Sequence, residues 1–231
     1  INYMSDFIKI SPKVIKISED DTTSNITIPS ILNSLSNSFQ IYDVDLYTSI
    51  QLLLLNLIQN FYRQSPSFME QIVNYMDSGI DLATTHPKCS MVSINFWQKV
   101  AIIENKIIDV SVINEKLNKN SIVEPLSPLL CETVSDHLIP KLIQIIENVD
   151  ETDTEVEDFK TRPMPSMYAN RAISAIYKII PEEVFNIVTK KIEEALEHKE
   201  KWSNLFIAIS LIYTICENPT NEVVADFINN I

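Results

Sequence analysis

Side chains that could do chemistry are sparse and scattered along this chain of 231 residues, apart from one dense run of acids. Neither the three cysteines nor the three histidines form a CxxC or HExxH motif; they are Cys89, Cys131, Cys216, His86, His137 and His198. Metal sites need such ligands in spaced sets, so we expect no metal and no other cofactor. No motif places a nucleophile beside a base. The sequence therefore predicts a protein that is not an enzyme, and its sparse cysteines favour a reducing compartment.

The dense acidic run covers residues 147–158 and contains seven acids and no base. Its members are Glu147, Asp150, Glu151, Asp153, Glu155, Glu157 and Asp158, and Phe159 follows them. Their summed field reaches about 8 Å at physiological salt and favours an extended loop unless a cationic partner binds. Most such runs are solvated linkers; the alternative is a binding site for a basic segment, with Phe159 as an apolar contact beside the charge.

The overall composition excludes several classes of function. A net charge of −13, from 31 acids against 18 bases, argues against direct nucleic-acid binding, which needs clustered Lys and Arg. The single glycine, Gly79, excludes phosphate loops and nucleophile elbows and disfavours an all-β sandwich. The longest apolar run, 50–58, is too short to cross a bilayer, so no membrane insertion is expected.

The elements that must carry the acidic run are helices, because apolar residues recur at i, i+3, i+4 and i+7. We predict an all-α fold over 1–231 with about four helix pairs, at 28–64, 67–104, 125–180 (with the acidic loop at 147–159) and 181–217, and partial repeats at both ends. The second helices begin at spacings of 44, 75 and 37 residues, and the longest spacing contains an extra segment at 105–124. Spacings of 37 and 44 residues are typical of HEAT or armadillo repeats, whose pairs stack into an α-α superhelix. An irregular helical bundle remains the alternative. The apolar, uncapped ends lead us to expect a piece of a longer protein.

Three stretches of the sequence stand together in order: Ile94-Asn95-Phe96-Trp97, the predicted helix 140–147 leading into the acidic loop, and Trp202 followed by a predicted helix that ends in 215–219. These stretches give the chain a resemblance to the importin-β (karyopherin-β) family. Their order and approximate spacing resemble successive repeats of that family over 26–231. The sequence departs from the family pattern in three respects: Asn218 stands where the family has glycine, Phe159 stands where it has tryptophan, and the acidic run is less dense than the family's because it contains Thr152, Thr154 and Val156.

The resemblance implies a central HEAT-repeat region of a nuclear transport receptor that shuttles between cytoplasm and nucleus. It implies that the acidic loop binds the GTPase Ran in its GTP form, and also the importin-α adaptor or basic cargo segments. The implied contacts are Asp150, Glu151, Asp153, Glu155, Glu157, Asp158 and Phe159. It also implies clefts between first helices for Phe-Gly nucleoporins, at Ile31, Leu35, Ile72 and Tyr75, although ordinary core packing is the competing interpretation of each. The alternative function is a HEAT-type scaffold of the phosphatase, coat or condensin kind, with no transport role.

Overall fold

The computed structural model describes residues 41–62, 69–116, 129–148, 164–217 and 222–231. Every regular element in these ranges is an α-helix, which confirms the predicted all-α class. The helices are α3 (Val44–Phe61), α4 (Met69–Ile80), α5 (Pro87–Lys116), α6 (Leu130–Glu147), α7 (Pro165–Tyr177), α8 (Pro181–Leu196), α9 (Trp202–Cys216) and α10 (Glu222–Asn230). None of the described helices is long and apolar enough to span a membrane.

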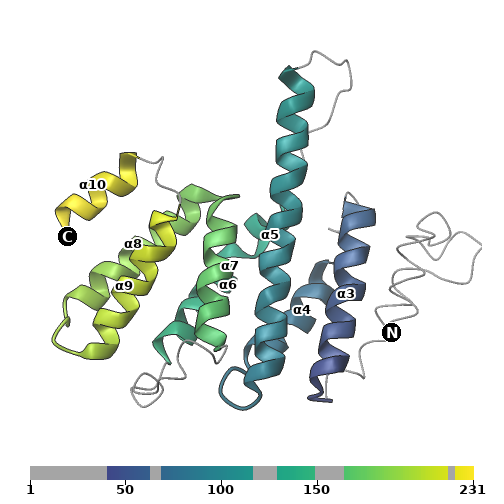
Figure 1. Cartoon of the computed structure of the whole chain (residues 1–231), viewed down its shortest axis with the longest axis horizontal. Helices are drawn as coiled ribbons and strands as arrows, with labels where there is room; N and C mark the ends of the chain where they lie inside the picture. The colour runs from purple at the N-terminus through teal and green to yellow at the C-terminus, as the bar shows by residue number, and fades with distance from the viewer. Residues whose placement is uncertain (1–40, 63–68, 117–128, 149–163, 218–221) are drawn as a thin grey trace, which may run out of the picture.

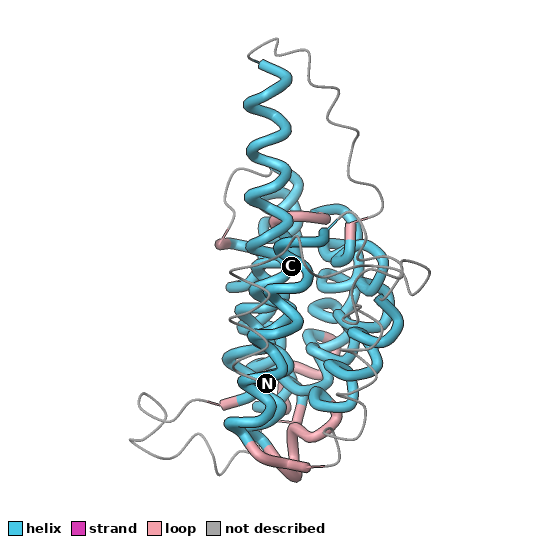
Figure 2. The backbone as a smooth tube through the Cα atoms, turned by 90° about the vertical axis from the view of Figure 1, so that its right-hand side faces the viewer, coloured by secondary structure: helices cyan, strands magenta, loops and turns pink. Residues whose placement is uncertain are grey.

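The helices lie side by side in the order of the chain (Figure 1) and form two layers (Figure 2). In one layer α4 contacts α6, and α6 contacts α8. In the other layer α3 contacts α5, α5 contacts α7, and α7 contacts α9. Each helix of the first layer also packs against the one that follows it in the chain, so α4/α5, α6/α7 and α8/α9 are pairs.

Helix α5 differs in length from its prediction. The pair predicted at 67–104 contains α4 and α5, but α5 continues to Lys116 and projects beyond its neighbours (Figure 1). No proline or glycine occurs between 88 and 124, so nothing in the chain stops the helix at residue 104. The extension lengthens the α5 surface that α7 can face.

Helix starts follow local signals. Asp43 caps α3, because its carboxylate accepts a hydrogen bond of 2.8 Å from the amide of Leu46. Pro165 and Pro181 occupy the first turns of α7 and α8, where a missing amide hydrogen costs nothing. Glu182 and Glu183 add negative charge at the positive end of the α8 dipole.

One continuous core runs between the two layers. Its largest fully buried side chains include Trp97 and Phe96 of α5, whose rings meet edge to face with centroids 5.3 Å apart. Gly79 lies in the last turn of α4 and is buried against α5: an added Cβ there would clash with the hydroxyl oxygen of Ser93 and lie 2.8 Å from its Cβ. The only glycine of the sequence therefore lets α4 and α5 approach closely.

Candidate functional site

The acidic residues predicted to bind Ran or a basic segment fall mostly outside the described residues. This applies to Asp150, Glu151, Asp153, Glu155, Glu157, Asp158 and Phe159, whereas Glu147 is the last residue of α6. The structure places the two flanking helices: α6 ends at Glu147 and α7 begins at Pro165. In the sequence, the acidic run lies between α6 and α7, which pack against each other.

The predicted nucleoporin residues divide in the same way. Ile31 and Leu35 lie outside the described residues. Ile72 of α4 is fully buried in the core, and Tyr75 is half-buried against it. Tyr75 therefore keeps some surface that a ligand could contact, and Ile72 keeps none.

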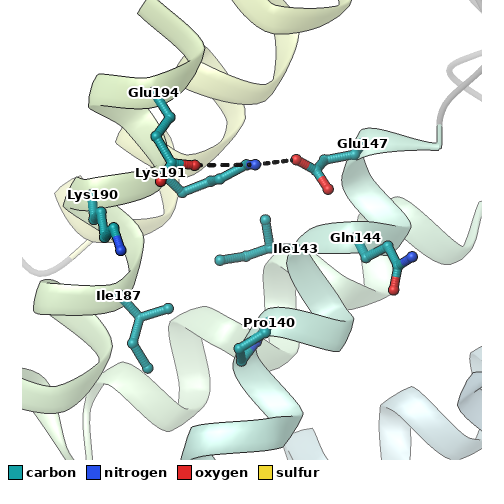
Figure 3. A pocket seen from close by; sticks show the side chains of 8 residues that line it. All are labelled: Pro140, Ile143, Gln144, Glu147, Ile187, Lys190, Lys191 and Glu194. Atoms are coloured by element: carbon teal, nitrogen blue, oxygen red, sulfur yellow. Dashed lines mark hydrogen bonds and ion pairs between the residues drawn. The ribbon is translucent and has the colours of Figure 1, made fainter.

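A cleft between α6 and α8 was not among the predicted sites (Figure 3). It has a volume of about 430 Å³, and Pro140 and Ile143 of α6 face Ile187 of α8 across it. Lys191 of α8 reaches over this apolar floor to Glu147, with 2.5 Å between its Nζ and the carboxylate Oε1. Lys191 is also 3.4 Å from Glu194 of its own helix. The cleft thus combines an apolar floor with a charged rim.

The hydrogen bond to Glu147 raises the pKa of Lys191 above its usual value, with further help from the charges of Glu147 and Glu194. Lys191 is therefore a cation throughout the physiological range. Because both partners are about 30% exposed, the pair is a partly screened link between α6 and α8.

A smaller cleft of about 220 Å³ repeats this arrangement one step earlier, between α4 and α6. Lys141 of α6 lies 3.4 Å from Asp77 and 3.2 Å from Asp81, which come from α4 and the turn after it. His137 Nε2 lies 3.2 Å from the same oxygen of Asp77. Burial lowers the pKa of Lys141, but the two carboxylates outweigh it and the net pKa is raised.

Lys141 and Lys191 therefore occupy equivalent positions in their helices, since each lies at nearly the same distance from the start of α6 or of α8. Each links its first-layer helix to the end of the preceding one. Sequence reasoning missed these links because the partners are 44 to 64 residues apart. Aligning Leu130 with Pro181 would have brought the two lysines to within one position of each other.

A buried carboxylate at Glu104 joins the α4/α5 pair to the α6/α7 pair. Glu104 is 0% exposed, and its oxygens accept hydrogen bonds from the amides of Leu130, at 2.5 Å, and Cys131, at 3.2 Å. The hydroxyl of Tyr62 donates to the same carboxylate. Its negative charge lies at the positive N-terminus of α6, where both free amides and the helix dipole stabilise it.

The neighbours of Glu104 lose acidity. Burial, together with the charge of Glu104 and a hydrogen bond to it, raises the pKa of the Cys131 thiol well above its usual value. Burial and the same carboxylate raise the pKa of Tyr62. Cys131 is thus a protonated, fully buried thiol, which is a poor nucleophile. The arrangement is suited to holding helices together.

Within the described ranges, no three His, Cys, Asp or Glu side chains are grouped so that they could hold a metal ion. Comparison with known proteins gives no family: neither a scan of protein-family models nor a search of curated proteins finds a match to this chain. The function must therefore be argued from the chain itself.

Proposed function

We propose that this chain is a HEAT-type helical solenoid whose surfaces bind other proteins, and that it acts as a nuclear transport receptor of the importin-β type. The observation that carries the proposal is the position of the acidic run. It lies between α6 and α7, within one pair of a two-layer stack of helix pairs. A run of such high negative charge between two packed helices is suited to binding a basic segment, because opposite charges attract.

The solenoid part of the proposal is supported by how the helices share their buried surfaces. Helix α7 contacts α5 and α9 in its own layer and α6 and α8 in the other. No single pair could bury both faces of such a helix, so neighbouring pairs stabilise one another. The salt links of Lys141 and Lys191, together with the buried Glu104, connect successive pairs by polar contacts.

The cleft between α6 and α8 supports the nucleoporin part. It lies between two neighbouring first helices, and its floor contains Pro140, Ile143 and Ile187. A volume of about 430 Å³ can hold an aromatic side chain. We propose this cleft as a Phe-Gly contact in addition to Tyr75 on α4.

In this proposal the protein acts without covalent chemistry. Cargo or the importin-α adaptor binds through a basic segment, and Ran-GTP displaces it by competing for overlapping surface. Exchange between partners requires shuttling between cytoplasm and nucleus, and it requires neither a cofactor nor catalytic residues.

Binding of Ran-GTP, with reversal of the charges on the acidic run, tests the proposal. We expect binding of Ran-GTP at moderate salt, and at least about tenfold weaker binding after Asp153, Glu155 and Glu157 are all changed to Lys. The matched control reverses three exposed acids elsewhere, Asp136, Glu193 and Glu197, which changes the net charge equally. If the two triple variants bind Ran-GTP equally, the acidic run does not contribute to this binding.

A HEAT scaffold with no transport role is the second candidate. The ion pairs between α4 and α6 and between α6 and α8 favour it, since they tie neighbouring first-layer helices together. Failure to bind Ran in either nucleotide state would select this candidate.

A further inference from the structure

The surface between α5 and α7 contains a groove in the layer opposite the α4/α6 and α6/α8 clefts. Its volume is about 600 Å³, and Glu217, which follows α9, also lines it. On α7 the lining residues recur every three or four positions, so they form one stripe along the helix. On α5 they recur in the same way from Gln98 to Asp109, a span of about 16 Å along the axis.

The rim of this groove carries three cations, Lys106, Arg171 and Lys178. For these three the described part of the chain supplies no ion-pair partner; Arg171 lies over the ring of Tyr168, 5.9 Å from its centroid. All three are exposed, and the stripe on α7 places Arg171 and Lys178 two turns apart on the same side.

The two acids of the lining already accept hydrogen bonds from neighbours. Asp109 accepts one from the Asn105 amide at 3.4 Å, and Glu217 accepts one from the Ser174 hydroxyl. The groove therefore has three positive against two negative side chains, on a chain whose net charge is −13. The net charge of the groove lining is therefore opposite in sign to the net charge of the whole protein.

The floor of the groove is apolar. Ala101 is buried, Ala175 is half-buried, and Ile102 is 43% exposed at the surface of the long helix α5. The amide side chain of Gln98 also lines it and can both donate to and accept from a peptide backbone. An extended chain rises about 3.3 Å per residue, so the 16 Å stripe accommodates about five residues.

We propose that this groove binds an extended acidic segment of a partner protein, with its carboxylates on Arg171, Lys178 and Lys106 and an apolar side chain on Ile102. Charge complementarity carries the assignment: the lining of the groove has a net positive charge on an acidic protein, and apolar side chains form its floor. The site is separate from the acidic run between α6 and α7, which would take a partner of the opposite charge.

The test measures binding of a fluorescein-labelled peptide in which Glu and Asp surround one central Leu, by fluorescence anisotropy at low salt with the whole chain. Changing both Arg171 and Lys178 to Glu should weaken binding at least about tenfold. The control variant changes Lys88 and Lys199 to Glu, which are exposed cations outside the groove, and should bind within about twofold of the unmodified chain. Circular dichroism confirms that the variants fold alike.

A third variant, Ile102→Ala, tests the apolar contact without changing charge and should weaken binding several-fold. The proposal is overturned if the acidic peptide does not bind the unmodified chain. It is also overturned if the two charge-reversal variants lose binding equally, because the attraction would then be general. A peptide with Lys and Arg in place of the acids reports on the acidic run instead, so this proposal can fail while the proposed function stands.

Discussion

Replacing the only glycine with alanine tests the close packing of α4 on α5. In Gly79→Ala the new methyl group would clash with the Ser93 hydroxyl oxygen, lie 2.8 Å from the Ser93 Cβ, and lie 3.1 Å from the ring of Tyr47. Both Ser93 and Tyr47 are buried, so neither can swing into solvent. The helices must move apart instead, which separates side chains along the whole α4/α5 contact.

Overpacking of this kind costs about 1–3 kcal/mol. Alanine is the better helix former by about 1 kcal/mol, but Gly79 lies in the last turn of α4, where this gain is smallest. We therefore expect a net loss of about 2 kcal/mol. For a chain of this size such a loss lowers the melting temperature by about 4–8 °C.

Urea unfolding followed by far-ultraviolet circular dichroism measures this loss, and a reciprocal variant identifies its cause. Ser93→Gly removes both Ser93 atoms that the methyl group would meet, and no hydrogen-bond partner of the Ser93 hydroxyl is found among the described residues. The double variant Gly79→Ala, Ser93→Gly should return to within about 1 kcal/mol of the original stability. A Gly79→Ala chain that is as stable as the original, or a double variant that is no better than the single one, would refute the close packing.

Three further predictions concern the polar groups inside the stack. Glu104→Gln should lower the free energy of unfolding, measured by urea titration, by about 2–3 kcal/mol, because the amides at the start of α6 lose a charged acceptor. The control Glu193→Gln, at an exposed position, should change it by less than about 0.5 kcal/mol. A double-mutant cycle on Lys191 and Glu147 should give a coupling of about 0.5–1 kcal/mol that falls as salt rises, and a coupling unaffected by salt would contradict an ionic link. Burial, with smaller contributions from Cys89 and Tyr42, raises the pKa of Tyr47 to about 12. The folded state therefore holds this proton more tightly than the unfolded chain. The stability that results is complete below about pH 10 and is lost as the pH rises to about 12. At about pH 11 the loss is about 1 kcal/mol, and Tyr47→Phe should remove this share of the alkaline decline in stability.

Much of the helical organisation could be predicted from the sequence because its signals are local. Apolar spacing indicates α3 to α9, and Pro181 with its two following acids marks the start of α8. The length of α5 was missed although its signals are local too: Ile107 and Val110 continue the apolar spacing of Val100 and Ile103, and no helix breaker follows them before the end of α5.

The polar links and clefts could not be predicted from local pattern. Glu104 is a charged residue that would ordinarily be exposed. Its burial depends on a hydrogen bond from the amide of Leu130, which lies 26 residues further along the chain. The cleft under Lys191 needs α6 and α8 to lie side by side, which is a property of the stack. The acidic run is the opposite case, since its charge is plain in the sequence and its position between α6 and α7 follows from the flanking helices.

Binding of Ran in its two nucleotide states would decide whether partners exchange at the acidic run. We predict that the protein binds Ran loaded with GTP at least about tenfold more tightly than Ran loaded with GDP, and that a basic segment competes with the GTP form. Equal affinity for the two forms, or binding to neither, would contradict partner exchange at the acidic run.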